Sequence, residues 1–386
     1  MLEYTLSVTD TLADVAANEW DQLIDNNPTL KHAWLQSMIA SGATTADTGW
    51  MPQFILLTRE VAGRKTLVGA VPLYMKFHSY GEYVFDWAWA EAYQRAGLNY
   101  YPKLLCAVPF TPCQGTRIMA NTAADRALLL DALIDIAKNG DVSSLHVLFA
   151  TDEENGALVD KGFMTRQAVQ FHWRNDGYAT FEDFLARMNH DKRKKIRQER
   201  KSVAKAGVTF QQKVGAAITE ADWDFFTRCY DSTYRAHRST PYLNREFFSL
   251  IGSKMAENVL LVIAEQEGVP IAASLNLFSA STLYGRYWGA TKFVSGLHFE
   301  ACYYQTLEFC IARGIQLFEG GAQGEHKLAR GFLPVACRSA HWIKDDRFKH
   351  AVSEFLRRET SGIDRFVDEL GEHAPYKLEP QPPASV

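Results

Sequence analysis

The stretch "TLYGRYWGATKFVSGLHFEACYYQTLEFCIARGIQLFEGGAQGEHKLARGF", residues 282–332, decides the fold of this chain. Its first nine residues are rich in aromatic side chains and predict a strand. Residues 297–314 have the apolar spacing of a helix that ends at a glycine, and residues 315–322 predict a second strand. Glycines mixed with polar side chains follow. We expect a strand-to-helix junction there. Glycine at such a junction lets the backbone come close to a ligand.

The elements on either side extend this pattern. The second half also predicts strands at 208–215, 259–268, 270–280 and 336–344, and helices at 219–237, 244–256 and 351–371. The first half predicts strands at 2–8, 52–61, 65–78, 83–90, 143–150 and 168–175, and helices at 11–24, 31–41, 122–140 and 154–162. Strand, two helices, three strands, helix, strand, helix and strand thus occur twice. This is the order of the acetyltransferase (GNAT) fold, a mixed sheet that splays to admit an acyl donor.

One long helix is expected between the two halves. Thr180 and Asp183 have the spacing of a capping box, and Gly207 is a natural stop. We therefore predict an α/β fold of mixed sheets in two tandem GNAT-like domains. Their expected ranges are 1–178 for the first domain, 179–207 for a basic linker helix, 208–378 for the second domain and 379–386 for a flexible tail.

Composition indicates an ordinary globular protein of 386 residues, 47% of them hydrophobic and 22% charged. The net charge of −4 gives no overall signature of nucleic-acid or membrane binding. Six scattered cysteines without a Cys-x-x-Cys pair are typical of reduced thiols. No apolar run approaches the roughly 20 residues of a membrane span, and the N-terminus does not have the pattern of a targeting peptide. A soluble, cytoplasmic protein is expected.

An ordered set of motifs resembles a known family. In the second half these are "QFHWRNDGY", "KRKKIRQER", "LYGRYWGA", "LHFEACYYQ", "EGGAQGEHKLARGF" and "SAHWI", and in the first half "FDWAWAEAY", "YYPKLLCAVPFTP" and "GTR". Together they are similar to the FemAB-like predicted N-acyltransferases of the GNAT superfamily, which are related to Fem-type peptidyltransferases. The resemblance covers nearly the whole chain.

The resemblance implies paired GNAT-like domains and the transfer of an acyl or aminoacyl group to an amine. Fem-type relatives move an amino acid from aminoacyl-tRNA to an amine of a peptidoglycan precursor, so a peptide or amino-acid acceptor is expected by analogy. No tightly bound cofactor is expected; the activated donor is a co-substrate. The motifs leave open whether that donor is aminoacyl-tRNA or acyl-CoA, and they do not indicate the oligomeric state.

The donor loop departs from the pattern of acetyl-CoA users. Those enzymes carry Gln/Arg-x-x-Gly-x-Gly/Ala between the fourth strand and the next helix, where this chain has "GATKFVSGLHFEAC". Backbone amides near Gly296 remain candidates to hold a pyrophosphate.

The linker helix carries nine Lys or Arg side chains between residues 187 and 205. One interpretation is a solvated linker, and the other is a phosphate-binding rail for tRNA or CoA. Under the second interpretation the expected contacts are Arg193, Lys194, Arg197 and Arg200.

The catalytic candidates are His298, Glu300 and His326, each able to accept a proton from an attacking amine. The alternatives are a helix cap for His298 and a favourable first-turn carboxylate for Glu300. On strand alternation, Arg286 and Trp288 should share one face with Tyr287 opposite. On helical spacing, Glu300, Tyr304 and Leu307 should share one face of the helix expected at 297–314.

Substrate contacts are expected from both halves. In the second half they are Arg286, Trp288, Tyr304, Gln323, Glu325, Lys327 and Arg330. In the first half they are Asp86, Trp89, Tyr101, Lys103, Gln114 and Arg117, which we expect to form a pocket wall. The alternatives are a sheet-face aromatic cluster for Arg286 and a charged turn for Lys327 and Arg330.

No metal is expected, because the spacings typical of zinc sites are missing from the sequence. The competing hypothesis for the whole chain is a non-catalytic protein that recognises a peptide or a nucleotide-linked ligand. The dense charged set at residues 323–330 argues against it.

Overall fold

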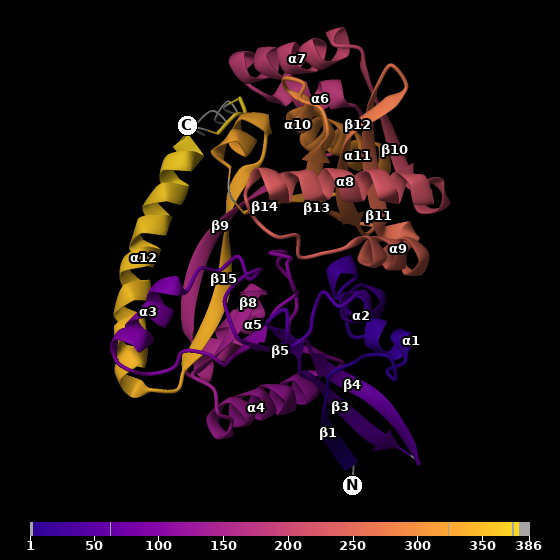
Figure 1. The fold of residues 1–386 in the computed structure, drawn as a ribbon. Coiled ribbons are helices and arrows are strands. Elements are labelled where there is room, and N and C mark those ends of the chain that lie inside the picture. Colours follow the sequence, from indigo (N-terminus) through magenta and orange to yellow (C-terminus); the bar gives the residue numbers. More distant parts are fainter. Residues whose placement is uncertain (1–2, 62, 323, 373, 378–386) are drawn as a thin grey trace, which may run out of the picture. The chain divides into compact units, whose positions relative to one another are not determined.

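The computed structural model describes residues 3–61, 63–322, 324–372 and 374–377, and it shows a mixed α/β fold with two β-sheets (Figure 1). The chain divides into two compact units. The first unit comprises 1–169, 240–259 and 336–365, and the second comprises 170–239, 260–335 and 366–386. Each unit is therefore built from three separate stretches of the chain. The domains predicted from the sequence, with boundaries at 178 and 207, are instead continuous stretches.

The first unit holds most of the N-terminal elements. Its strands are β1 (Glu3–Thr9), β2 (Trp50–Pro52), β3 (Phe54–Val61), β4 (Arg64–Val71), β5 (Leu73–Lys76), β6 (Lys103–Cys106), β7 (Met119–Ala120) and β8 (Ser144–Ala150). Its helices are α1 (Ala17–Asp21), α2 (His32–Ala40), α3 (Trp87–Arg95), α4 (Ala123–Asn139), α5 (Asp152–Asp160) and α9 (Arg245–Lys254). Strands β1, β3, β4 and β7 form an antiparallel sheet, and β8, β6, β5 and β2 lie in the second sheet.

The second unit contains most of the elements between residues 170 and 335. Its helices are α6 (Phe181–Arg187), α7 (His190–Lys205), α8 (Glu220–Ala236), α10 (Leu297–Phe299) and α11 (Gln305–Arg313), with a π-helix at Glu300–Tyr304 and a 3-10 helix at Glu325–Arg330. Its sheet order is β10 (Val208–Val214), β11 (Val259–Gln266), β12 (Val269–Phe278), β13 (Thr282–Ala290), β14 (Leu317–Ala322) and β9 (Met164–Arg174). Strands β9 and β15 (Leu333–Ile343) and helix α12 (Asp346–Glu372) each cross the division between the units.

Two sequence predictions in the first half were wrong. The strand expected at 83–90 is replaced by helix α3, which begins after Asp86. Trp89 and Tyr93, four residues apart, both lie buried on one face of that helix, so a helical period governs the aromatic residues there. The helix expected at 11–24 is reduced to α1. Helix α4 ends at Gly140 as predicted.

The predicted single helix at 180–207 is in fact two helices. Met188 between them is extended, with φ −74° and ψ 152°, and it forms a β-bridge with Tyr376. Asn189 then caps α7 by accepting a hydrogen bond from the amide of Lys192 at 3.0 Å. The capping box of Thr180 and Asp183 is confirmed. The break arises because Asn189 offers the backbone a new helix start.

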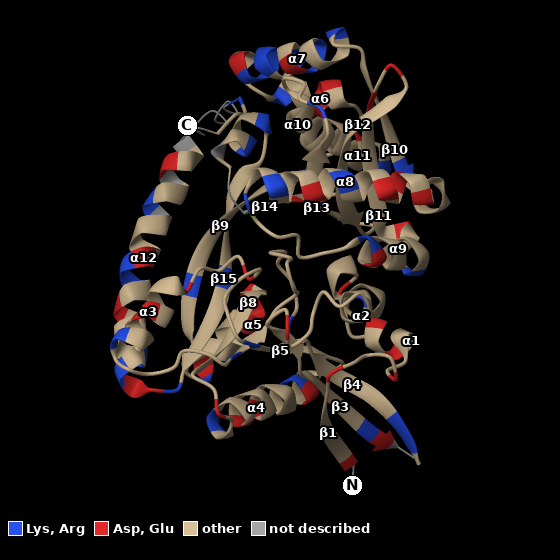
Figure 2. Cartoon of the chain, in the orientation of Figure 1, with Lys and Arg blue, Asp and Glu red and all other residues tan. Residues whose placement is uncertain are grey.

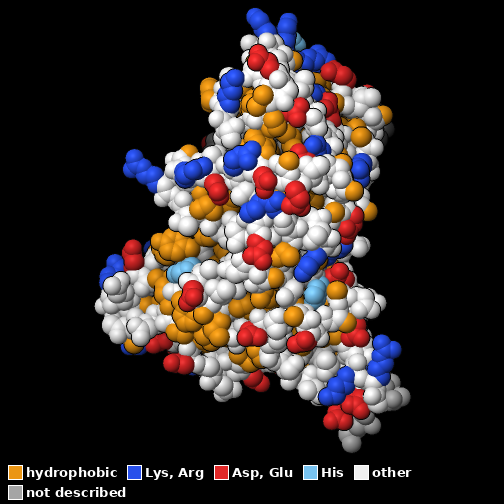
Figure 3. All heavy atoms as spheres, turned by 45° about the vertical axis from the view of Figure 1, so that its right-hand side comes forward, with side chains coloured by type: hydrophobic (Ala, Val, Ile, Leu, Met, Phe, Trp, Pro, Cys, Tyr) orange, Lys and Arg blue, Asp and Glu red, His pale blue; other side chains and the backbone are white. Residues whose placement is uncertain are grey.

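The charge of α7 is confined to its exposed surface, since only Ile196 and Val203 are buried along it. Figure 2 marks Lys and Arg positions in blue along α7, and Figure 3 shows blue side chains at the same end of the second unit. None of the helices in the described ranges has the length and apolar character that crossing a bilayer requires. None of the six cysteines, all of which lie in the described part, forms a disulfide.

Candidate active site

Strands β13 and β14 run side by side only at their beginnings. They are parallel, and the registered pairs join Thr282–Tyr284 to Leu317–Glu319. Beyond Tyr284 the described part of β13 no longer pairs with β14. The carbonyls of Trp288 and Ala290 accept hydrogen bonds from hydroxyls of α8 instead, at 2.8 and 2.9 Å. The two strands therefore part toward their carboxyl ends, as the sequence-based fold predicts.

Helix α8 packs against β13 and β12 at very short range, while the π-helix contacts β12 and α11 contacts β10 and β14 (Figure 1). A Cβ atom at Gly289 would stand 1.9 Å from the carbonyl oxygen of Cys229. Only glycine fits this position, so α8 is fixed against the strand where it separates from β14.

A β-bulge lies in the same strand. The register of β12 and β13 shifts opposite Leu275 and Asn276. The guanidinium of Arg286 lies 4.9 Å from the ring centroid of Tyr287 and contacts its hydroxyl at 3.4 Å. The predicted alternation, which placed these two side chains on opposite faces, is wrong here because a bulge re-aims the side chain.

The helix after β13 begins at a glycine in the left-handed conformation, and within one turn it changes from an α-helix to a π-helix. Gly296 has φ 83°. The π-helix Glu300–Tyr304 then separates α10 from α11. Glu300 accepts a hydrogen bond from Gln305, five residues on, at 2.9 Å, whereas Tyr304 turns to Glu199. Glu300 and Tyr304 both reach α7, where they contact Arg200 and Glu199, so the predicted shared face of these two residues is confirmed. A π-turn of this kind is frequent at functional sites.

An aromatic and imidazole group, which we call the histidine cluster, lies over this turn. The hydroxyl of Tyr303 is 3.1 Å from Nε2 of His326, and the rings of His298 and His326 are 6.1 Å apart. The cluster consists of Trp288, His298, Phe299, Tyr303 and His326. Two of the three predicted catalytic residues, His298 and His326, are thus brought together, with Trp288 beside them.

Both imidazoles are held in the neutral form at neutral pH. Burial, followed by the charges of His326 and Arg330, lowers the pKa of His298 to about 4. Burial and the charge of Arg330 also lower the pKa of His326, whose side chain is exposed to solvent. A neutral imidazole that solvent can reach is able to accept a proton from a substrate.

Arg330 is a buried structural ion-pair residue. Its guanidinium contacts the Glu199 carboxylate at 2.8 Å and lies 3.4 Å from the ring centroid of Phe299. It also donates to the carbonyl of His326 at 2.6 Å. Glu199 accepts a further hydrogen bond from Tyr304. Arg330 and Tyr304, both predicted to bind substrate, instead fix the 3-10 helix and the π-helix to α7.

Lys327 lies buried near the same histidines. Its ammonium donates to the carbonyl of Gly321 at 3.3 Å. Burial lowers its pKa to about 8, and its charge contributes to lowering the pKa of His172, His298 and His326. A cation in this position could stabilise negative charge that develops on a reacting carbonyl. Two further residues predicted to contact substrate belong to this turn. Gln323 lies outside the described residues, and so does the side chain of Glu325.

Glu300, the third catalytic candidate, is paired with a predicted phosphate ligand. Arg200 contacts the buried Glu300 carboxylate at 3.0 Å and that of Glu308 at 2.8 Å. It also lies 4.6 Å from the ring centroid of Phe181. Arg200 is therefore engaged by two carboxylates, contrary to its prediction as a phosphate contact, and Glu300 is poorly suited to act as a base.

The remaining phosphate candidates lie on the exposed side of α7. Arg197 forms an ion pair with Glu182. Lys194 is exposed and Arg193 is half-buried. The lysines exposed along the helix are Lys194, Lys195, Lys201 and Lys205.

The first-half candidates do not form the expected pocket wall. Asp86, Trp89 and Lys103 are buried within the first unit, where Lys103 is ion-paired with Asp86. Tyr101 donates to or accepts from Ser79 at 2.8 Å. The sequence correctly predicted a group of polar and aromatic residues here, but it did not predict that most of this group is buried.

Arg117 and Gln114 are structural residues. The fully buried guanidinium of Arg117 donates to the carbonyls of Leu148 and Gly115 at 2.9 and 3.0 Å. The Gln114 amide donates to the carbonyl of Ala150 at 3.5 Å. The prediction that Arg117 binds substrate is therefore wrong, because its donors are used by the backbone.

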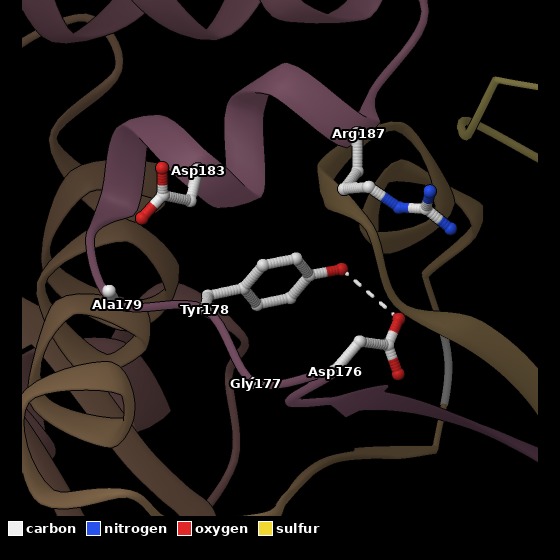
Figure 4. A pocket seen from close by; sticks show the side chains of 6 residues that line it. All are labelled: Asp176, Gly177, Tyr178, Ala179, Asp183 and Arg187. Carbon is white, nitrogen blue, oxygen red and sulfur yellow. Dashed lines mark hydrogen bonds between the residues drawn. The ribbon is translucent and has the colours of Figure 1, made fainter.

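A surface pocket that the sequence did not predict lies between β9 and α6. Its volume is about 590 Å³. Figure 4 shows the Tyr178 hydroxyl pointing to Asp176, to which it donates a hydrogen bond at 3.2 Å. The lining residues are Asp176, Gly177, Tyr178, Ala179, Asp183 and Arg187. Two carboxylates and a guanidinium give this pocket a mixed charge.

Sequence reasoning missed Glu199, Tyr303 and Phe299. Glu199 was hidden among the nine cations of the basic segment, and its partner Arg330 is 131 residues away in the sequence. Among the described residues, His, Cys, Asp and Glu side chains do not gather into a group of three that could hold a metal ion.

The chain is similar to a known family and to solved structures. The model of the FemAB-like family, described as peptidoglycan biosynthesis/recognition, matches residues 11–378. The crystal structure of FemX is similar with a TM-score of 0.54 and 12% identity, covering 88% of this chain and 98% of that one. A conserved protein of unknown function from Bacteroides thetaiotaomicron VPI-5482 has a TM-score of 0.52 and 12% identity, covering 88% and 100%. A search of curated proteins finds no match.

Proposed function

Because this chain belongs to the FemAB-like family, we propose that it is an N-acyltransferase that joins an acyl or aminoacyl group to an amine. The observation that carries the proposal is the parting of β13 and β14 next to two neutral histidines. A gap between strands admits an extended donor, and the family description supports a peptide-like acceptor from peptidoglycan metabolism.

The reaction we propose is direct attack of the amine on the donor carbonyl. The new carbon–nitrogen bond forms as the bond from the carbonyl carbon to the leaving oxygen or sulfur breaks. His326 accepts the proton that the amine loses, since it is the exposed member of the histidine cluster. Tyr303, hydrogen-bonded to Nε2, orients the imidazole. Lys327 and backbone amides hold the developing oxyanion.

We infer that the donor is an aminoacyl-tRNA, with acyl-CoA as the second candidate. Four lysines are exposed along α7, an arrangement suited to a polyanion. The chain also lacks the Gln/Arg-x-x-Gly-x-Gly/Ala loop of acetyl-CoA users. The acceptor would be the amine of a peptidoglycan-related peptide or amino acid in the cytoplasm.

The test is an intact-mass assay of product formation. The purified protein would be incubated with charged tRNA or with acetyl-CoA, each together with a panel of peptide amines. Product with charged tRNA, reduced 100-fold or more by His326→Gln, would support the proposal. Absence of product with both donors, alongside tight binding of a peptide or nucleotide-linked ligand, would replace it with the non-catalytic hypothesis.

A further inference from the structure

The connection between β5 and β6 is much longer than these strands require. They are antiparallel neighbours, and Lys76 at the end of one lies opposite Lys103 at the start of the other. Such strands are usually joined by two to five residues. Here residues 77–102, which include α3, make the connection. We call this segment the flap, and it belongs entirely to the first unit.

The inner side of the flap carries charge. The Lys103 ammonium contacts Glu82 at 2.8 Å and is also paired with Asp86. Lys76 lies 3.9 Å from the other oxygen of Glu82 and 3.7 Å from the ring centroid of Trp50. Both lysines are fully buried, on the sheet, while both carboxylates come from the flap. Two cations directly opposite on paired strands repel each other unless anions lie between them.

The same sheet face continues into two buried histidines. Nδ1 of His146 is 2.7 Å from Nδ1 of His341, which pairs with it across β8 and β15. Nε2 of His146 lies 3.1 Å from the Tyr100 hydroxyl, which donates to Asp86 at 2.7 Å. Lys76, Lys103, His146 and His341 thus form a row of basic groups across four strands. We call this row the basic ladder.

The outer side of the flap is hydrophobic. Tyr80 and Phe85 are each 58% exposed, although large aromatic side chains normally turn inward. The exposed hydrophobic residues of the flap are Phe77, Tyr80, Tyr83, Phe85, Trp87 and Leu98. The flap is divided in this respect, because Trp89, Tyr93 and Tyr100 in its second part are buried in a hydrophobic cluster. The part that carries Glu82 and Asp86 has most of its aromatic side chains outside, so its contacts with the basic ladder contribute to holding it in place.

The flap carboxylates satisfy the ladder incompletely. Glu82 Oε1 and Asp86 Oδ1 are buried without a hydrogen-bond partner, as is Nε2 of His341. A buried oxygen in that condition destabilises the arrangement, because it has lost its hydrogen bonds to water. Burial also raises the pKa of Glu82 to about 7 and lowers that of Lys76 to about 6, so the charge between these two is weak at neutral pH. A ligand with better-placed oxygens would compete effectively.

We propose that the basic ladder is a binding site for a small dianion, with two carboxylate or phosphate groups, and that Glu82 and Asp86 of the flap occupy it in this structure. Lysines suit either kind of oxyanion, because an ammonium acts as a point charge. Displacement of the flap removes both carboxylates together and leaves two lysines on the sheet, beside His146 and His341, whose pKa values burial lowers. The proposal is independent of the acyl-transfer function, since the ladder lies in the first unit.

Binding is then a competition between the ligand and the flap. The apparent dissociation constant equals the intrinsic value divided by the fraction of molecules whose flap is displaced. Removing the flap charges raises that fraction, so we expect Glu82→Gln with Asp86→Asn to bind at least about 10-fold more tightly than the wild type. A flap that is only a structural plug would lose stability in this variant and gain no affinity.

The experiment is calorimetric titration of the full chain with sodium pyrophosphate and with sodium malonate, at constant ionic strength set by chloride. Tighter binding of either probe to the double variant and loss of binding in Lys103→Met support the site. Lys65→Met, at an exposed lysine of the same unit, is the matched control and should bind as the wild type does. The better probe distinguishes phosphate from carboxylate. Equal affinity of the wild type and the double variant overturns the proposal.

A second measurement keeps the test independent of variant folding. Hydrogen exchange of the wild type, with and without the tighter-binding probe, should show faster exchange at residues 77–102 when the probe is bound. Unchanged exchange there, or no binding of either probe by the wild type and by the single variant Glu82→Gln, contradicts the site.

Discussion

At the residue scale, the proposed chemistry rests on the histidine cluster and its buried supports. His298 and His326 are adjacent in space although 28 positions separate their numbers, and burial keeps both neutral. Arg330 and Glu199 hold the segment that carries His326. The predictions at this scale concern proton binding and ion pairing.

The first prediction concerns the pH dependence of turnover. A base must be deprotonated, so activity falls as pH drops through its pKa. Since the pKa of His326 lies below its ordinary value of 6.5, we expect the acid limb of kcat/KM below pH 6.5. His326→Gln should remove that limb along with most of the activity. A limb at or above pH 7 that survives in His326→Gln would assign the base to another group.

The second prediction concerns stability in acid. Burial lowers the pKa of His172 to about 4, so the unfolded chain binds more protons than the folded one between pH 4 and 6.5. The free energy of unfolding should therefore decrease as pH falls through this window, by at most about 1.4 kcal/mol per pH unit from this group. Urea unfolding at pH 5 and 7 should show a smaller difference for His172→Gln. An unchanged difference would contradict the assignment.

The third prediction tests the buried ion pair. Glu199→Ala leaves the Arg330 guanidinium, whose side chain is 3% exposed, without its carboxylate. We expect a loss of about 3–5 kcal/mol in the free energy of unfolding. Glu182→Ala, which removes the exposed pair with Arg197, is the control and should cost less than about 1 kcal/mol. Similar losses for both variants would show that burial of the pair is unimportant.

At the element scale, interruptions of regular structure place the site. The bulge in β13, the π-helix before α11 and the break between α6 and α7 each change which residues face one another. Periodicity predicted these elements well, but it cannot predict where a period shifts by one residue. The predicted face of Arg286 was wrong for this reason.

The fourth prediction concerns the contact between α8 and β13. Gly289→Ala would place Cβ 1.9 Å from a backbone carbonyl that cannot rotate away. We expect the helix to shift, at a cost of about 1–3 kcal/mol or more, and turnover to fall because the strands part at this position. Gly362→Ala, where Cβ would meet nothing within 4 Å, should instead stabilise α12 by about 0.5–1 kcal/mol. Thermal unfolding of both variants measures the difference.

At the scale of the whole molecule, each compact unit draws on distant parts of the chain. Residues 170–174 of β9 pair with β14 in the second unit, and residues 336–343 of β15 belong to the first. A division of the sequence at residue 178 therefore cuts through the larger sheet, because β9 and β14 pair with each other and lie on opposite sides of that boundary.

The fifth prediction follows from this interleaving. The fragment 208–378, which sequence analysis delimits as a domain, lacks β9 and so exposes the edge of β14. We expect it to aggregate or to unfold without cooperativity, as followed by circular dichroism in urea. Cooperative unfolding of this fragment would show that the second half is a domain by itself.

By itself, the sequence determined most of the element types, the mixed sheets, the parting of β13 and β14 and the family, because these depend on local periodicity and on an ordered set of motifs. It also singled out His298 and His326, which the structure brings together. Only the tertiary structure decided that Glu300, Arg200, Arg330 and Arg117 are bound by the protein's own groups, and that Lys103 is buried under a flap. The physical reason is that a charged side chain has the same appearance in a sequence whether its partner is a substrate or a residue 131 positions away.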